Sequence, residues 1–244
     1  MLALVEEYTI ARAREDYNEF CRYVLRDEQT GGPLNWAAYH EDYLKFLHET
    51  EACVVFGHVE MGKTQLGIGY ILWRIGHNPN LPILLLNATS TISQRTAATL
   101  RAHIMSNERL HKVFPDLKPG TPWTDEEFCV QRREGITTPT VVAAGVDSSI
   151  ISFRFDIVWG DDIVNNENTQ TAYLRQKVLT WFQNSPMSRT SRGMKVMITV
   201  NRWHPNDAAH MLARLPGWRT RVYPVGKRRP DGSIVSYWPT HWPV

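Results

Sequence analysis

A run of eight residues in the first third of the chain has the composition and spacing of a loop that binds phosphate. The segment Gly57-His-Val-Glu-Met-Gly-Lys-Thr64 matches the pattern GxxxxGK[ST], follows an apolar stretch typical of a strand, and opens a predicted helix. Successive backbone N–H groups and a helix N-terminus form an anion cradle, and glycines let the backbone approach phosphate. Nucleotide contacts are therefore expected at Gly57, His58, Val59, Glu60, Met61, Gly62, Lys63 and Thr64.

Two side chains of this loop are expected to act together with a pair of acids further along the chain. In such loops the lysine, here Lys63, reaches the β- and γ-phosphates, and the hydroxyl of Thr64 ligates Mg²⁺. The segment Ile157-Val-Trp-Gly-Asp161-Asp162 predicts an apolar strand that ends in two carboxylates. We expect Asp161 to hold Mg²⁺, directly or through water, and Asp162 to polarise the attacking water. Without the phosphate loop, the same pair would indicate only an acidic turn after a strand. ATP and Mg²⁺ are thus the expected cofactors.

A third polar side chain, Asn201, follows the apolar run 195–200, which predicts another core strand. In open α/β sheets, residues at the carboxyl ends of the strands face the ligand crevice. The amide of Asn201 both donates and accepts hydrogen bonds, so it can sense the γ-phosphate or orient the attacking water. A local cap of the turn after the strand explains the same residue equally well.

The elements that must position these residues alternate between strand and helix from residue 52 onward. Apolar, β-branched runs between helical segments predict an α/β fold with a mostly parallel central sheet sandwiched by helices. Strands are expected at 52–56, 82–87, 128–131, 140–144, 155–159, 195–200 and 219–225, and helices at 63–75, 90–106, 169–184 and 207–215. Two further helices, at 5–27 and 36–49, are expected before the sheet.

The composition excludes several classes of protein. The chain has 244 residues, of which 43% are apolar and 21% charged, so wholesale disorder is excluded. The net charge, 27 − 25 = +2, does not by itself demand a nucleic-acid partner. Cys21, Cys53 and Cys129 form no CxxC pair, so neither a zinc ribbon nor a disulfide framework is expected. No apolar run approaches the ~20 residues of a membrane span, and the early acidic N-terminus does not resemble a signal peptide.

Together, the three motifs resemble the ATPase part of the large terminase subunit, the DNA-packaging motor of tailed bacteriophages. The order is the family's: a phosphate loop, an acidic strand end, then the segment Asn201-Arg-Trp-His204 followed by Asp207. The stretch 161–169 and the upstream segment Trp36-Ala-Ala-Tyr-His40 also resemble the family. The Arg-Trp-His segment at this spacing is the most specific part. The resemblance implies a RecA-like P-loop NTPase of the ASCE type, with a helical N-terminal extension.

The resemblance also implies a function and partners. It implies a Mg-dependent ATPase that translocates double-stranded DNA into viral procapsids in the host cell cytoplasm and is not part of the mature virion. A homo-oligomeric ring, a pentamer, would assemble on the portal protein, with the small terminase subunit as a further partner and no membrane involved. Full-length members carry an RNase H-like nuclease domain with an acid cluster, whereas Asp231 is the only acid here after Gly226. We therefore expect a helical segment at 1–50, the ATPase core at 51–226, and a linker at 227–244 toward a nuclease domain absent from this sequence.

The sequence departs from the family pattern at three places. Asp162 stands where many members have Glu, which is one methylene longer, so Glu60 and Glu167 are alternative bases. Residues 58–59 occupy a stretch where many members have Arg, and Asn201 stands where Thr is usual.

A ring motor needs a cation that stabilises transition-state charge, often supplied by the neighbouring subunit. We expect Arg154, just before the acidic strand, to take this role; the alternative is a surface arginine flanking a strand. Arg202 is the second candidate, although its aromatic neighbour indicates structural stacking. Trp36 and His40 are expected to line the adenine pocket; the alternative is that they pack the aromatic face of an amphipathic helix.

DNA contacts of a motor should be phosphate-directed and independent of sequence. The basic candidates are Lys112, Lys118, Arg132, Arg133 and the turn Lys227-Arg-Arg229. The competing functions are a P-loop kinase, another DNA-dependent ATPase or helicase, and a nucleotide-binding assembly protein that does not hydrolyse. No segment resembles the arginine-bearing lid helix of a kinase, and the acid pair at 161–162 argues against the assembly protein.

Overall fold

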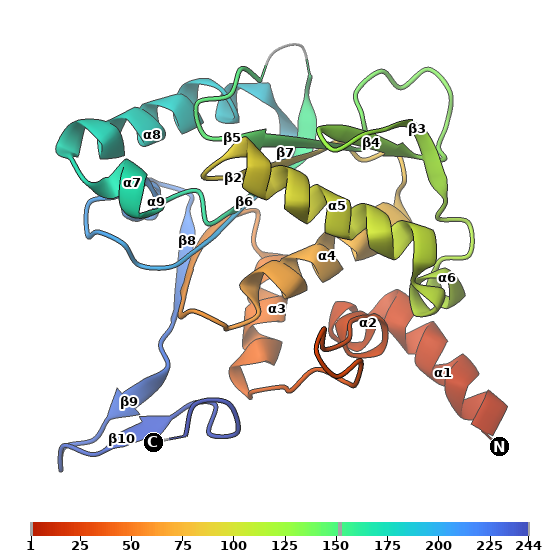
Figure 1. Cartoon of the computed structure of the whole chain (residues 1–244), viewed down its shortest axis with the longest axis horizontal. Helices are drawn as coiled ribbons and strands as arrows, with labels where there is room; N and C mark the ends of the chain where they lie inside the picture. The colour runs from red at the N-terminus through yellow and green to blue at the C-terminus, as the bar shows by residue number, and fades with distance from the viewer. Residues whose placement is uncertain (1, 151–152, 244) are drawn as a thin grey trace.

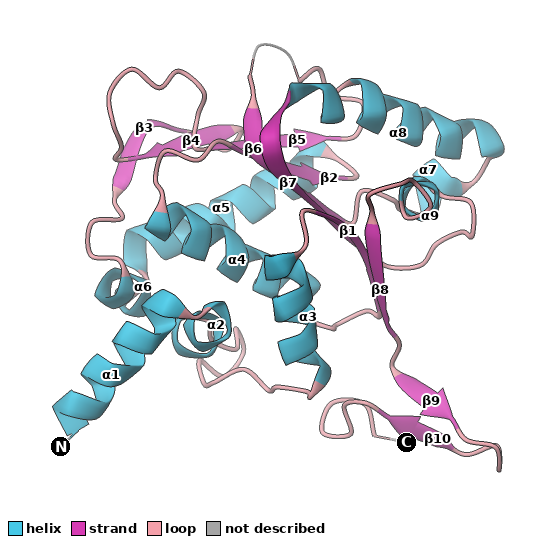
Figure 2. Cartoon of the chain, turned by 180° about the vertical axis from the view of Figure 1, so that it is seen from behind, coloured by secondary structure: helices cyan, strands magenta, loops and turns pink. Residues whose placement is uncertain are grey.

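Eight strands in the computed structural model, which describes residues 2–150 and 153–243, form one sheet with helices on both faces (Figure 1, Figure 2). The strand order is β3-β4-β5-β2-β6-β7-β1-β8. The strands are β1 (Ala52–Gly57), β2 (Ile83–Asn87), β3 (Pro119–Trp123), β4 (Glu127–Val130), β5 (Val141–Gly145), β6 (Phe155–Asp161), β7 (Thr190–Val200) and β8 (Arg219–Tyr223). The helices are α1 (Leu2–Glu15), α2 (Tyr17–Val24), α3 (Tyr39–Glu49), α4 (Lys63–His77), α5 (Ser90–Ser106), α6 (Glu108–Val113), α7 (Asn166–Thr169), α8 (Ala172–Asn184) and α9 (Ala208–Leu212).

The two faces of the sheet bury separate hydrophobic clusters because successive side chains of a strand point in opposite directions. Along β1, Cys53 and Val55 join a cluster with helices α1 to α6, while Val54 and Phe56 join a second cluster with α8 and α9. The core therefore continues on both sides of the sheet, as an α/β sandwich requires. None of the helices in the described part of the chain has the length and apolar character needed to cross a bilayer.

The sheet topology confirms the predicted fold class. Strands β5, β2, β6, β7, β1 and β8 are parallel, and β4 and β3 add antiparallel at one edge. One strand, β7, lies between β1, which leads into the phosphate loop, and β6, which ends in the acids, as expected for a RecA-like, ASCE-type sheet. In this register Asp161 pairs with Thr199 and Phe56 with Val200, so the polar strand ends lie at the same edge.

The N-terminal helices differ from the prediction. The single helix predicted at 5–27 is wrong, because Asp16 separates α1 from α2 and its carboxylate accepts hydrogen bonds from the backbone N–H groups of Asn18 and Glu19. Aspartate favours such an N-cap over a helix interior. Helix α2 packs on α4, where the Tyr17 hydroxyl donates to the Leu66 carbonyl at 2.7 Å.

Other helices and strands differ from the prediction in their bounds. The helix predicted at 169–184 begins at Ala172 as α8, where the Thr171 hydroxyl caps it, and the short helix α7 precedes it. Helix α6 and edge strand β3 were not predicted, and β7 begins at Thr190 rather than at Lys195. The strands predicted at 128–131 and 140–144 are present as β4 and β5, and they pair antiparallel.

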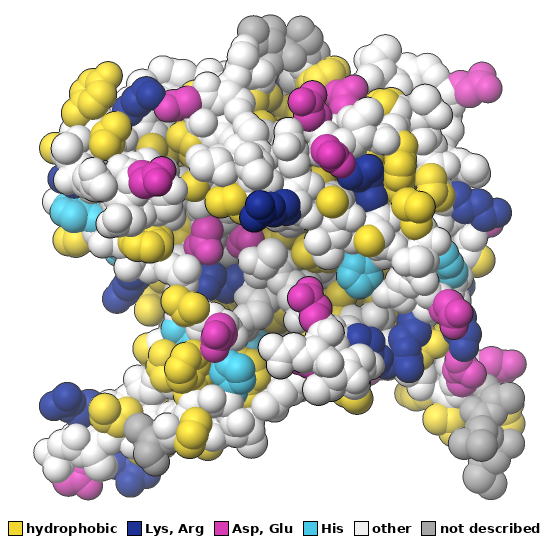
Figure 3. Space-filling model, viewed as in Figure 1, with side chains coloured by type: hydrophobic (Ala, Val, Ile, Leu, Met, Phe, Trp, Pro, Cys, Tyr) yellow, Lys and Arg dark blue, Asp and Glu magenta, His cyan; other side chains and the backbone are white. Residues whose placement is uncertain are grey.

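The C-terminal stretch contains structure that was not predicted. Strands β9 (Gly226–Arg228) and β10 (Ile234–Ser236) form an antiparallel hairpin that projects from the body of the molecule (Figure 1, Figure 3). Beyond it, a segment that we call the strap, residues 237–243, returns to the phosphate loop, where His241 Nε2 lies 3.2 Å from Glu60 Oε2. Thr240 and Asn35 also exchange side-chain hydrogen bonds.

Candidate functional site

The phosphate loop joins the end of β1 to the start of α4. Its backbone is left-handed at Gly62 (φ 84°) and at Glu60 (φ 62°). Gly57 has no room for a side chain, because a Cβ there would lie 2.5 Å from Met61 Sδ and 2.9 Å from Lys63 Cδ. Both glycines of the motif are thus required by the path of the chain.

The ammonium group of Lys63 links the loop to the neighbouring strand. Its Nζ donates to the His58 carbonyl at 2.8 Å and to Asn201 Oδ1 at 2.9 Å. Burial lowers the pKa of this lysine, and the carboxylates of Asp162 and Asp161 oppose the shift. Lys63 is 6% exposed, so its charge is held in place by the site and not by solvent.

The carboxylate of Asp161 is held by two hydroxyls. Thr64 Oγ1 donates to its Oδ2 at 2.6 Å, and Thr199 Oγ1 donates to its Oδ1 at 2.7 Å. The side-chain amide of Asn87 donates to the Asp161 carbonyl at 2.6 Å. Burial, followed by repulsion from Asp162, raises the pKa of Asp161 to about 6. The Asp161 carboxylate and the Thr64 hydroxyl are therefore in contact beside the phosphate loop, in a buried environment that disfavours the charged carboxylate.

Asp162 and Asn201 contact each other beside Lys63 in the same site. Asp162 has left-handed backbone (φ 47°), which aspartate tolerates better than most residues. Its Oδ1 accepts from the Asn201 backbone N–H at 3.0 Å, and its Oδ2 accepts from the Asn201 amide at 3.3 Å. The Asn201 amide thus contacts Lys63 through oxygen and Asp162 through nitrogen. Asn201 therefore contacts two other residues of the site and does more than cap the turn after its strand. Burial raises the pKa of Asp162.

The donor set fits Mg²⁺ bound together with phosphates. Mg²⁺ prefers hard oxygen ligands and often takes only one or two from the protein, with phosphates and waters completing the shell. Thr64 Oγ1 and Asp161 Oδ2 are such oxygens, and they already lie 2.6 Å apart. No cluster of three or more His, Cys, Asp or Glu side chains able to hold a metal occurs among the described residues. A Mg²⁺ ion held by Thr64 and Asp161 would complete its shell with phosphate oxygens and waters.

A cavity of about 480 Å³ opens beside these groups. It is lined by Glu28, Val59, Glu60, Met61, Gly62, Lys63, Thr64, Gln65, Ile68, Ile92, Arg95, Thr96, Thr99, Asp162 and Asn201. Sequence reasoning missed three residues of this region: Arg95, which lines the cavity, and Asn87 and Thr199, which hold Asp161. Of these, only Asn87 carried a usable signal, a polar residue at the end of a predicted strand.

A smaller cavity of about 170 Å³ also adjoins the phosphate loop. Trp36 and His40 line it, together with Gln65 of α4 and with Trp238 and His241 of the C-terminal stretch. Trp238 stacks on His241 with ring centroids 4.3 Å apart. The predicted base-binding residues are therefore near the loop, while their contact with adenine stays a prediction.

His40 is also built into the fold as a neutral imidazole. Its Nδ1 accepts from the Ala37 backbone N–H at 2.9 Å, so its Nε2 must donate to the Met61 carbonyl at 3.0 Å. Protonation would replace the Nδ1 acceptor with a donor facing another N–H group. Burial lowers the pKa of His40 to about 4, although the hydrogen bond to the Met61 carbonyl opposes the shift.

We expect His40 to make folding sensitive to acid. A lowered pKa in the folded state gives stability that is fully present above pH 6.5 and is lost as the pH falls toward 4. The free energy of unfolding should fall between pH 7 and 4.5 by about 2 to 3 kcal/mol more in the wild-type chain than in His40→Gln. Urea titrations at the two pH values measure this, with His204→Gln as the control. An identical pH dependence in wild type and His40→Gln would contradict it.

The remaining predicted residues lie away from the cavity. Arg154 is exposed at the beginning of β6, roughly 20 Å along the strand from Asp161, so it cannot serve the site of its own chain. Glu167 is exposed on α7 and does not line either cavity, whereas Glu60 lines both. The role of Arg154 toward a neighbouring subunit stays a prediction.

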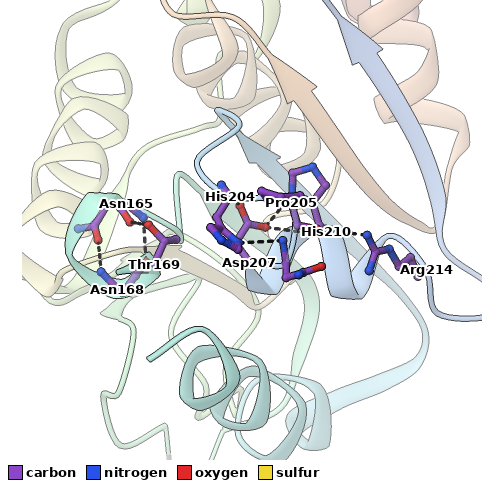
Figure 4. Close-up of polar contacts among 9 residues, drawn as sticks. Asn165, Asn168, Thr169, His204, Pro205, Asp207, His210 and Arg214 are labelled. Carbon is purple, nitrogen blue, oxygen red and sulfur yellow. Dashed lines mark hydrogen bonds and ion pairs between the residues drawn. The ribbon is translucent and has the colours of Figure 1, made fainter. Parts of the chain in front are cut away.

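The segment after Asn201 is held by a buried carboxylate. Asp207 accepts from the backbone N–H groups of His204 and His210 and contacts His210 Nδ1 at 3.0 Å (Figure 4). The Arg202 guanidinium lies 5.4 Å from the ring centre of Phe56, which supports structural stacking for this arginine. Contacts with Asp207 and Phe56 thus hold the loop that follows Asn201.

Comparison with known proteins supports the resemblance. No protein-family profile matches the chain. A curated relative, the terminase large subunit of Enterobacteria phage T3, is 24% identical over 125 residues, which are 50% of this chain and 21% of the relative. The matched stretch thus spans about a fifth of the relative's own length. The resemblance expected from the motifs is confirmed by this match.

Solved structures with partial similarity to the chain include two of a terminase ATPase domain. The large terminase ATPase domain of a Thermus phage covers 75% of this chain and 80% of its own at 11% identity, with a TM-score of 0.42. A variant of that domain covers 72% and 77% at 12% identity, also with a TM-score of 0.42. The S. cerevisiae protein dbp5, bound to nup159, gle1 and ADP, covers 78% of this chain and 48% of its own at 12% identity, with a TM-score of 0.49.

Proposed function

We propose that this chain is an ATP-hydrolysing motor domain of a phage terminase large subunit, which translocates double-stranded DNA into a viral procapsid. The observation that carries the proposal is the connected site at the carboxyl edge of the sheet. Lys63, Asn201 and Asp162 form one chain of hydrogen bonds, and Thr64 contacts Asp161 beside it. This is the set of groups that phosphoryl transfer from a nucleoside triphosphate requires.

Each group has a role that follows from its chemistry. Lys63 would leave Asn201 Oδ1 for the β- and γ-phosphate oxygens, which frees the amide of Asn201 to contact the γ-phosphate or the attacking water. Asp162, with its pKa raised, would accept a proton from that water as it attacks phosphorus. Thr64 and Asp161 would hold Mg²⁺, which when bound neutralises charge on the phosphate oxygens. The 480 Å³ cavity is large enough for the triphosphate end of a nucleotide.

The assembly and partners follow from the same proposal. Because Arg154 lies at the opposite edge of the sheet, it would act on the site of a neighbouring subunit in a ring, proposed to be a pentamer. The ring would bind the portal protein and the small terminase subunit in the host cytoplasm. The conversion of phosphate chemistry into DNA movement would then depend on contacts between subunits.

The projecting hairpin is the most accessible group of basic residues for DNA. Lys227, Arg228 and Arg229 are exposed on β9 and the turn after it, and basic side chains gather there in Figure 3. Arg133 is exposed too but contributes a single free charge, and Lys112 pairs with Glu6, which leaves it less free for phosphate. Arg132 is held by the Ile136 and Thr138 carbonyls, so it supports a loop. We therefore rank the hairpin first among the proposed phosphate contacts.

Turnover with DNA and procapsids tests the proposed function. ATP hydrolysis by the wild-type chain should rise when double-stranded DNA and procapsids are both added, and Lys63→Ala should lose nucleotide binding because the phosphates lose their main cation. We expect at least a hundredfold drop in kcat/KM for Lys63→Ala, while Lys45→Ala, an exposed lysine of α3, should change it less than twofold. Transfer of phosphate to a small-molecule acceptor without stimulation by DNA would instead identify a kinase.

A further inference from the structure

Helix α5 contributes a second cation to the cavity beside the phosphate loop. Ile92, Arg95, Thr96 and Thr99 all line it, and their spacing of three to four residues places them on one face of α5. The Arg95 side chain is exposed, and no other residue in the described ranges forms a hydrogen bond or ion pair with its guanidinium. A free guanidinium in the wall of a cavity is available to bind an anion.

The charges of the cavity wall show why an anionic ligand would use it. Three carboxylates, on Glu28, Glu60 and Asp162, line the cavity against two cations, on Lys63 and Arg95. Lys63 is already engaged by a backbone carbonyl and by Asn201. A triphosphate entering this acidic wall needs further positive charge, and Arg95 is the cation without a competing partner.

The position of Arg95 also selects which phosphate it reaches. It lines the cavity that contains Asp162 and Asn201, and it does not line the smaller cavity of Trp36 and His40. The start of α5 is fixed close to the acids, since Asn87, three residues before Ser90, donates to the Asp161 carbonyl. Arg95 therefore belongs to the hydrolytic end of the site.

We propose that Arg95 binds the γ-phosphate of the nucleotide held by its own chain, as a catalytic cation in cis. This inference rests on the proposed function, because it requires a triphosphate in the phosphate loop. It differs from the role of Arg154, which would serve a neighbouring subunit. A guanidinium makes two parallel hydrogen bonds to a phosphate, so it would stabilise the charge that moves onto the equatorial oxygens during transfer.

Comparing the affinities for a nucleoside triphosphate and a diphosphate distinguishes a lost γ-phosphate contact from general damage to the site. In the presence of Mg²⁺, Arg95→Ala should weaken a non-hydrolysable ATP analogue about tenfold and change ADP binding less than twofold. Arg95→Lys should recover part of the loss, because it keeps the charge without the two-pronged geometry. The control is Arg101→Ala, which removes a positive charge from the same helix at a residue paired with Asp125 outside the cavity. It should leave both affinities unchanged.

Single-turnover hydrolysis at concentrations where the chain is monomeric gives the second measurement. Arg95→Ala should lower the rate roughly a hundredfold there, and mixing with wild-type subunits should not rescue the mutant sites. If wild type binds Mg-ATP and Arg95→Ala weakens both nucleotides equally or neither, the inference is overturned and the proposed function stands. If wild type binds no nucleotide triphosphate, the proposed function fails, and the inference fails with it.

Discussion

Asp162→Asn is expected to abolish hydrolysis while Mg-ATP remains bound. The substitution keeps the size of the side chain and suits the left-handed backbone at this position (φ 47°), but it removes the carboxylate that accepts the water's proton. Loss of a general base costs typically 10²–10⁴-fold in rate, so kcat should fall at least a hundredfold. Binding of Mg-ATP, measured by fluorescent-nucleotide titration, should change less than threefold, because Lys63 and Thr64 are untouched.

The control for this variant is Asp147→Asn. Asp147 also has left-handed backbone (φ 68°) and lies in the loop after β5, where it pairs with Lys177 outside the cavity. Its activity should equal that of wild type. If Asp162→Asn retains hydrolysis, the base is elsewhere, and Glu60 is the next candidate, because it lines the cavity and Glu167 does not. Glu60→Gln in the Asp162→Asn background then identifies it.

The chemical groups of the site are predictable from the sequence because they lie at strand ends next to strong local signals. Gly57 and Lys63 carry a motif whose backbone requirements leave few alternatives, and Asp161 and Asn201 end apolar runs that can only be core strands. Parallel strands bring their carboxyl ends to one edge, so the meeting of these residues follows from the fold class alone.

The contacts that tune the site are not predictable in this way. Thr199 reaches Asp161 only because β7 pairs with β6 in one particular register, and nothing local in the sequence fixes that register. In the sequence Arg95 is an ordinary polar residue of a predicted helix, and only the packing of α5 beside the phosphate loop brings it to the cavity. The helix break at Asp16 depends on an N-cap, which the apolar periodicity of the segment does not reveal. Strand β3 contains Pro119 and Pro122, which are tolerated there because it is an edge strand.

Gly67→Ala is expected to destabilise the fold although it adds only one methyl group to the core. Gly67 lies in α4 directly against the indole of Trp159 in β6, and a Cβ there would approach Trp159 Cζ2 to 2.0 Å. Alanine favours a helix interior over glycine by about 1 kcal/mol, but overpacking a rigid ring costs about 1–3 kcal/mol and here also displaces β6. We expect a net loss of about 2 kcal/mol in the free energy of unfolding, measured by urea titration.

A double-mutant cycle shows whether this contact also sets the geometry of the site. The colliding atoms belong to the outer ring of the indole, which Trp159→Phe removes, so the loss in the double variant should be about 1 kcal/mol smaller than the sum of the single losses. Purely additive losses would contradict the collision.

The same indole donates to Thr199 Oγ1 at 3.2 Å, and Thr199 in turn holds Asp161. The spacing of α4 from β6 therefore sets the distance between Thr64 and Asp161, and Gly67→Ala should weaken Mg²⁺-dependent nucleotide binding, while Gly69→Ala, which presses on Cys21 and Leu25 away from β6, should not.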